Sequence, residues 1–415
     1  MAELLINRVE RNIKELKLDP DRKYGVAFSG GPDSVFLLHS LSHAGFKKLH
    51  LLYVNYHDSP SVDKEEKMVK AYAHIYKASI NIASCRLTEG NFENEARIYR
   101  YNYFSKCTQE FGLSGVFVAH HQDDSILTYL MQKKRGGLVE RYGIADRTIY
   151  KKTEILRPLL CVTKKEILGF LKFNNFPYYD DLTNNNLDRT RNELRIKVLP
   201  NIDREKILKE MEGDNAELAI LNRKINPYLT GIVPYSFYYG LAEEERMYFL
   251  RSIKKPLIKD GIAYDKANIK LAYENLKKKN STALCILKGG LNLYRNYEGF
   301  YFSAAVLPTS YSHKMHVPGI YEFDEVFIDM TKPTSYNIRL SMFPLTVRSV
   351  EKDDVFSTDI VNKSVFNFLK TQKVPKYLRE TYPVISDKDG NIVYVPFYKD
   401  LKEDRIPMRI KNIIL

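Results

Sequence analysis

The sequence predicts an α/β protein whose amino-terminal domain is a doubly wound parallel sheet. Two observations favour this fold class. Short apolar runs alternate with stretches of helical periodicity, as expected where helices connect parallel strands. The turn SGGPDS at residues 29–34 lies where the first run passes into a helix, a junction at which such sheets bind ligands. With 415 residues, the chain is long enough for two or three domains.

The elements of the first domain follow one another in a regular order. Apolar residues at helical spacing from Leu5 to Leu16 predict an opening helix. The strands are expected at 24–28, 49–54, 79–83 and 115–119, and helices are expected at 61–77 and 93–111 between the later strands. Ligands bind at the carboxyl ends of strands in such sheets, so we expect the site just after residues 28, 54 and 119.

The rest of the chain divides less clearly. Thr163 and Glu166 predict a capping box at the start of a helix. Residues 203–279 have helical character, whereas 291–303 and the hairpin-like 386–397 predict strands. The expected domains are 1–202, a mostly helical 203–315 and a small α+β domain at 316–415.

The composition favours a polyanionic partner and gives no sign of a membrane span. Lys and Arg total 64 against 51 Asp and Glu, a net charge of +13, although a solvated basic surface is the alternative explanation. No apolar run reaches the roughly 18–20 residues of a transmembrane helix, so we expect a cytoplasmic protein. The four cysteines form no CxxC pair, which predicts reduced thiols rather than a zinc or iron–sulfur site.

The SGGPDS turn has the features of a phosphate site. Glycines let the backbone approach a ligand, and the first N–H groups of the following helix carry partial positive charge. The alternative is an ordinary turn in which Ser29 or Asp33 only caps the helix. The Walker pattern is absent, and the hexapeptide instead resembles the SGGxDS loop of the PP-loop ATP pyrophosphatases. That resemblance implies cleavage of ATP between its α and β phosphates.

A second polar cluster, HHQDD at 120–124, follows the last predicted strand of the sheet. An Asp cap beside surface histidines is the alternative explanation. The cluster precedes a helix whose buried stripe is expected to be Ile126, Leu127, Leu130 and Met131. Together with Arg135-Gly136-Gly137, it is similar to the HHxDDxxET…RG motif of the tRNA(Ile)-lysidine synthases, a PP-loop family.

Further segments extend this resemblance over nearly the whole chain. They are EAR…RY at 95–101, LRPLL at 156–160, DDLTNNNLDRTRNELRIKVLP at 180–200, LTVRSVEKDD at 345–354, KVPKYLRETYPVI at 373–385 and DGNIVYV at 389–395. The family resemblance implies ATP-dependent ligation of L-lysine to the wobble cytidine of a tRNA(Ile) with a CAU anticodon. An adenylated cytidine would be the intermediate, and AMP and pyrophosphate the products. Domain 1–202 would bind ATP and Mg²⁺, and 316–415 would bind tRNA.

The resemblance and the chemistry together assign roles to individual residues. The expected catalytic residues are Asp33, Asp123, Asp124 and Arg135, with Asp33 also a ligand of Mg²⁺. The expected ATP-binding residues are Ser29, Gly30, Gly31, Pro32, Asp33, Ser34, Asn55, His57, Arg97, Arg100, His120 and Gly136. The expected tRNA-binding residues are Arg191, Asn192, Arg195, Lys197, Arg348, Lys376 and Arg379. Ordinary ion pairs and a solvated basic helix are the alternatives for the cations.

The chain departs from the family pattern at two places. Leu127 stands where the motif has Glu, so recognition of the lysine amine stays open, with Asp124, Glu89 or Glu140 as alternative carboxylates. The run VNYHDS at 54–59 lacks an Arg that often follows the family's second strand. A PP-loop tRNA thiolase and a non-catalytic RNA-binding protein with a relic loop are the rival functions. The oligomeric state is also open, a homodimer included.

Overall fold

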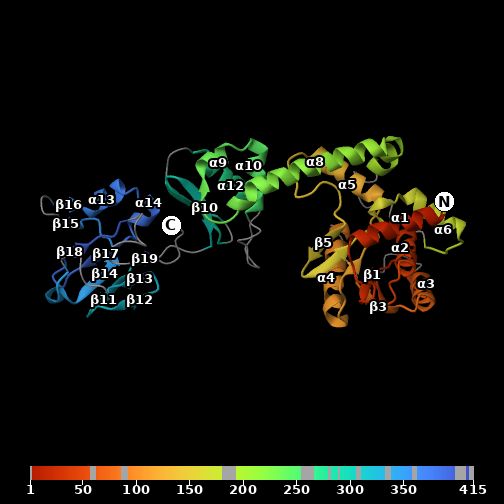
Figure 1. Ribbon diagram of the computed structural model, residues 1–415, viewed down its shortest axis with the longest axis horizontal. Coiled ribbons are helices and arrows are strands. Elements are labelled where there is room, and N and C mark those ends of the chain that lie inside the picture. The colour runs from red at the N-terminus through yellow and green to blue at the C-terminus, as the bar shows by residue number, and fades with distance from the viewer. Residues whose placement is uncertain are drawn as a thin grey trace. The chain divides into compact units, whose positions relative to one another are not determined.

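The computed structural model groups the chain into two compact units, residues 1–219 and 220–415 (Figure 1). It describes residues 2–56, 62–85, 92–179, 193–253, 266–278, 282–287, 290–304, 310–331, 338–357, 362–397 and 408–410. None of the helices in these ranges combines the length and apolar character that a membrane crossing requires.

The first unit is built on a six-stranded sheet with the order β3-β2-β1-β4-β6-β5. Its strands are β1 (Tyr24–Ala27), β2 (Leu49–Asn55), β3 (Ser79–Ser84), β4 (Val116–Phe117), β5 (Arg147–Tyr150) and β6 (Thr153–Leu156). All neighbours are parallel except β5, which is antiparallel to β6. The four strands predicted from the sequence are confirmed, whereas the hairpin of β5 and β6 was not foreseen.

The helices of this unit alternate with the strands as predicted. They are α1 (Ala2–Glu15), α2 (Pro32–His43), α3 (Val62–Ile75), α4 (Phe92–Phe111), α5 (Gln122–Arg135), α6 (Lys164–Phe173) and α8 (Arg204–Ile225). Short 3₁₀ turns cover Pro158–Cys161 (η1) and Leu199–Asn201 (η4), and a π-helical turn, η3, covers Leu194–Val198. The capping box of Thr163 and Glu166 at the start of α6 is confirmed.

Successive residues of a strand point to opposite faces, and both faces of this sheet are covered. Leu51 and Tyr53 of β2 pack with residues of α1, α2, α3 and α6. Leu52, between them, packs with Tyr101 and Phe104 of α4 on the other face. Burial on both sides explains why the strands read as apolar runs rather than as alternating patterns. The doubly wound arrangement predicted from the sequence is therefore confirmed.

Helix α5 packs against the start of α8. Ile126 and Leu127 are fully buried and contact Leu199 and apolar residues of α8. Near the other end of α5, Asp214 of α8 accepts hydrogen bonds from the Tyr129 hydroxyl at 2.9 Å and from the Lys133 ammonium at 2.8 Å. Burial alone would raise the pKa of Asp214, but these hydrogen bonds hold it below its ordinary value.

The second unit contains three sheets. Their strand orders are β7-β10-β9-β8, β11-β14-β17-β18-β15-β16 and β12-β13-β19. The strands are β7 (Val233–Pro234), β8 (Ala283–Ile286), β9 (Asn292–Arg295), β10 (Gly299–Ser303), β11 (Ser312–Met315), β12 (Ile320–Glu322), β13 (Val326–Asp329), β14 (Leu345–Ser349), β15 (Val355–Ser357), β16 (Asn362–Ser364), β17 (Pro383–Ser386), β18 (Ile392–Tyr394) and β19 (Met408–Ile410).

The helices of the second unit lie mostly in the segment predicted to be helical. They are α9 (Tyr235–Tyr239), α10 (Glu243–Ser252), α12 (Lys266–Lys277), α13 (Val365–Thr371) and α14 (Lys376–Arg379), with 3₁₀ turns η5 (Asn226–Tyr228) and η6 (Leu340–Met342). Segment 203–315 also contributes the four-stranded sheet. The last strand of this segment, β11, pairs with β14 and so belongs to the six-stranded sheet of the second unit. The expected boundary at 315/316 therefore falls directly after a strand of that sheet.

An ion pair inside the second unit fixes the turn after β14. The guanidinium of Arg348 donates two hydrogen bonds to the carboxylate of Asp354, at 2.8 and 2.7 Å. The two side chains are only 15% and 9% exposed. Burial alone would raise the pKa of Asp354, but the hydrogen bonds from Arg348 and from the Glu351 N–H lower it.

We expect Arg348→Ala to lower the free energy of unfolding by about 3 kcal/mol, because it leaves a buried carboxylate without its partner. The folded-state pKa of Asp354 is lowered, so the stabilisation is present above about pH 4 and is lost as the pH falls through the lowered pKa. Urea unfolding of both proteins at pH 7 and pH 3 tests this. Lys363→Ala, at an exposed position on β16, is the control. Equal stability of the Arg348→Ala variant and wild type at pH 7 would contradict the assignment.

Candidate functional site

The site lies where the strand order of the first sheet reverses. From β1 the chain adds β2 and β3 on one side and then returns to add β4 on the other. Helices α2 and α5 follow β1 and β4, so their amino termini both lie at the carboxyl edge of the sheet. An open α/β sheet binds its ligand at such a point, and the two motifs predicted from the sequence occupy it.

The loop after β1 leaves its backbone open to a ligand. Gly30 has φ +79°, a conformation that favours glycine, and a Cβ there would come within 2.7 Å of the Met68 Cε atom. Ser34 Oγ donates to the carbonyl oxygen of Gly31 at 2.8 Å. Gly31 is the N-cap of α2, and no side chain caps that helix. The first N–H groups of α2 therefore stay available to an anion.

The carboxylates of Asp33, Asp123 and Asp124 are brought together, with His121 between two of them. Asp33 lies in the first turn of α2, and Asp123 and Asp124 lie in the first turn of α5. His121 Nε2 is 3.9 Å from Asp33 Oδ2 and 3.5 Å from Asp124 Oδ2. Its side chain is 2% exposed, so the ring is buried beside these two carboxylates.

Each carboxylate also faces a cation from a later part of the sequence. The Lys164 ammonium donates to both oxygens of Asp33, at 2.7 and 2.8 Å, and the Lys164 N–H donates to Asp123 Oδ2 at 3.1 Å. Arg204 contacts the other oxygen of Asp123, and Arg195 Nη2 lies 3.9 Å from Asp124 Oδ1. The charge cluster consists of Asp33, His121, Asp123, Asp124, Lys164, Arg195 and Arg204.

Lys164 and Arg204 were not predicted from the sequence. Lys164 is the first residue of α6, where a positive charge opposes the helix dipole. A lysine directly after a strong N-cap is therefore a local signal of a nearby anion. Arg204 is likewise the first residue of a helix, α8, where its positive charge opposes the helix dipole. Neither position reveals from the sequence which carboxylate the cation contacts, because the partners are 131 and 81 residues away.

The structure does not bring Arg135 or Gly136 into the charge cluster. Arg135 is the last residue of α5 and Gly136 is its C-cap. Arg135 comes 12 residues after Asp123 on this helix, a separation of about 18 Å at 1.5 Å per residue. Arg97 and Arg100 are exposed on α4, and the Arg97 guanidinium lies 5.0 Å from the centre of the Tyr101 ring.

Two other predicted nucleotide contacts lie at strand ends. Asn55 is the last residue of β2, is 4% exposed and donates to Glu66 Oε1 at 3.1 Å. His120 follows β4 and accepts a hydrogen bond on Nδ1 from Arg157 at 3.2 Å. His57 lies outside the described residues.

The residues predicted to contact tRNA are spread over both units. Arg191 and Asn192 lie outside the described residues. Lys197 is exposed and pairs with Glu193 at 3.0 Å. Lys376 is exposed on α14, and Arg379 donates to the Val374 carbonyl oxygen and to the Tyr297 hydroxyl, both at 2.9 Å. Arg348 is the partner of Asp354 described above.

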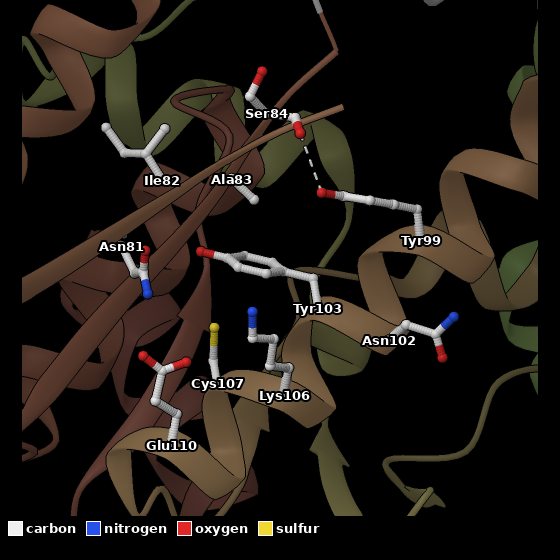
Figure 2. A pocket seen from close by; sticks show the side chains of 10 residues that line it. All are labelled: Asn81, Ile82, Ala83, Ser84, Tyr99, Asn102, Tyr103, Lys106, Cys107 and Glu110. Atoms are coloured by element: carbon white, nitrogen blue, oxygen red, sulfur yellow. Dashed lines mark hydrogen bonds between the residues drawn. The ribbon is translucent and has the colours of Figure 1, made fainter. Parts of the chain in front are cut away.

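A hollow of about 490 Å³ lies elsewhere in the first unit, between the outermost strand β3 and helix α4 (Figure 2). In it, the Tyr99 hydroxyl donates to the carbonyl oxygen of Ser84 at 3.2 Å. Tyr103 and Cys107 form part of its wall. None of the residues predicted for the site lines this hollow.

The chain is similar in sequence to known proteins. Residues 5–202 match the family described as PP-loop domain. The tRNA(Ile)-lysidine synthase of Mesoplasma florum is 29% identical over 70% of this chain and 75% of its own. The enzymes of that name from Staphylococcus aureus and Bacillus cereus are each 26% identical, over 89% and 96% of this chain and 92% and 93% of their own lengths.

The loop at residues 29–34 and the charge cluster, apart from Arg204, lie within the matched domain. The similarity to the relatives continues through the second unit, since two of them match about nine tenths of the chain or more. Residues 5–202 therefore form a PP-loop domain, and the chain is similar over most of its length to tRNA(Ile)-lysidine synthases.

Proposed function

We propose that this protein is a tRNA(Ile)-lysidine synthase that joins L-lysine to the wobble cytidine of a tRNA(Ile) with a CAU anticodon. The observation that carries the proposal is the open glycine loop beside three carboxylates, within a PP-loop domain. A phosphate loop binds the ATP that activates a poor leaving group, and carboxylates can hold an amine nucleophile. The proposed reaction needs both.

In the first step, the cytidine carbonyl oxygen attacks the α phosphorus of ATP and pyrophosphate leaves. The α2 amino terminus and the backbone at Gly30 offer N–H groups where negative charge grows. Ser29 and Ser34 flank this position, with Ser29 Oγ accepting from the Gly31 N–H at 3.3 Å. A side chain on either glycine would contact its neighbours closely, so the bare loop fits a phosphate group.

Mg²⁺ would enter with the nucleotide and would help neutralise the phosphate charge. Among the described residues, no group of three or more His, Cys, Asp or Glu side chains is placed to hold a metal ion. Mg²⁺ commonly takes one or two protein carboxylates and completes its shell with phosphates and water. Asp33, in the first turn of α2, fits such a single carboxylate ligand.

In the second step, the lysine ε-amine attacks the activated ring carbon, AMP leaves, and the nitrogen loses a proton. Asp124 is the carboxylate that we propose to hold the incoming amine. Leu127, which replaces the family's Glu, is fully buried against Leu199 and offers no charge. Glu140 is exposed, and Glu89 lies outside the described residues.

We propose that a basic surface on both units docks the tRNA. The net charge of +13 suits a phosphate backbone, because each contact releases counterions and strengthens binding at low salt. Arg195 would link this surface to the site, since it faces Asp124. Lys197 and Lys376 are exposed and suit phosphate contacts. Arg191, Asn192 and Arg379 are the other residues that we propose to contact tRNA.

Incubation of the protein with ATP, labelled lysine and an unmodified tRNA(Ile) transcript tests the function. We expect label in the tRNA only when ATP is present, with one AMP and one pyrophosphate formed per lysine. A transcript whose wobble base is uridine is the control and should stay unlabelled. Formation of ADP and phosphate, or labelling of the control transcript, would contradict the proposal.

We expect Asp33→Asn to lower the rate of AMP formation by about 100-fold or more, because it removes the carboxylate that would hold Mg²⁺ at the phosphates, where the cation offsets the growing negative charge. The affinity for tRNA should change little, since the docking surface is separate. Single-turnover AMP formation and a tRNA binding titration measure the two effects. Asp21→Asn, an exposed aspartate before β1, is the control. Parallel loss of both properties would indicate a structural role for Asp33.

A further inference from the structure

Lys164 contacts two of the three site carboxylates, and its backbone is held in place at the start of α6. Its N–H donates to Asp123 and its ammonium to Asp33. Helix α6 is anchored by the capping box of Thr163 and by a 2.6 Å ion pair between Glu166 and Arg8. Ile167, one turn further, is fully buried. The start of the lysine stem is therefore fixed, and only the flexible side chain is free to move.

The ammonium of Lys164 is not sealed inside the protein. Its side chain is 35% exposed, and that of Asp33 is 29% exposed. The pair thus lies at the mouth of the loop, where a ligand can reach it. A lysine ammonium is a compact charge on four rotatable carbons, so it can exchange one anionic partner for another without movement of α6.

The position of Lys164 depends on an anion. It is the first residue of α6, where the partial positive charge of the helix terminus repels it. Asp33 supplies the compensating charge. Any cation that binds Asp33 competes with the ammonium for the same two oxygens, and it also repels Lys164.

No other carboxylate of the charge cluster is ready to accept the displaced ammonium. Asp123 already receives the Lys164 N–H and the Arg204 guanidinium, one on each oxygen. Asp124 receives the His121 N–H at 3.2 Å and faces Arg195. The nearest new anion would be the phosphate chain in the loop that contains Asp33.

We propose that Lys164 is a catalytic residue that leaves Asp33 when Mg²⁺ and ATP bind and contacts the β and γ phosphates. This inference rests on the proposed function and adds a residue to its first step. When the cytidine oxygen forms its bond to the α phosphorus, the bond to the bridging oxygen breaks and its electron pair stays on pyrophosphate. Lys164 stabilises that charge electrostatically, and no proton transfer is required.

Pyrophosphate binding, measured by calorimetry with and without Mg²⁺, tests the proposal. We expect Lys164→Gln to weaken binding of magnesium pyrophosphate by about 10- to 100-fold, the effect of losing a charge-assisted hydrogen bond. The loss should be smaller in EDTA, where the ammonium of the wild-type protein still pairs with Asp33. Lys165→Gln removes the same charge from the adjacent exposed residue and should have little effect in either condition.

Lysine acylation of the wild-type protein gives a second readout that does not depend on the folding of a variant. Magnesium pyrophosphate should protect Lys164 from acylation but leave Lys165 reactive, as measured by mass spectrometry. Equal effects of the two Gln variants on binding, or an unprotected Lys164, would overturn the proposal. If the wild-type protein binds pyrophosphate and protects Lys164 but forms no AMP, the proposed function fails and the phosphate contact stands.

Discussion

The meeting of three helix amino termini at one edge of the first sheet is the constraint on which the site depends. Helices α2, α5 and α6 each point a partial positive charge at this edge. Asp33 and Asp123 lie in the first turns of α2 and α5, and Lys164 of α6 bonds to both of them. The carboxylates therefore compensate the helix termini as well as the lysine.

Ion pairs and hydrogen bonds connect this edge of the sheet with helix α8. Arg204 begins α8 and contacts Asp123, and Asp214 further along α8 holds Tyr129 and Lys133 of α5. Loss of any one ion pair leaves another charge without its partner, which costs more than the pair contributes. We infer that these contacts hold the charge cluster rigid, whereas the partly exposed side chain of Lys164 can change its partner.

Local sequence patterns were enough to predict the strands and helix starts that position the site. The strand before SGGPDS, the strand before HHQDD and the capping box at Thr163 each follow from neighbouring residues, and each is present. The partners of the carboxylates were not predictable, because Lys164 and Arg204 meet them across 131 and 81 residues. Arg135 was expected beside the phosphates only because its motif resembles that of the family. Only the length of α5 shows that it lies far along the helix from Asp123.

We propose that the glycine loop activates the cytidine carbonyl by transfer of AMP. The most direct test uses a tRNA(Ile) whose wobble cytidine carries ¹⁸O at the C2 carbonyl. If that oxygen attacks the α phosphorus and later leaves with AMP, mass spectrometry will find one ¹⁸O in the phosphate of each AMP formed. Unlabelled AMP accompanying lysine incorporation would contradict the account, because the carbonyl oxygen would then have left by another route.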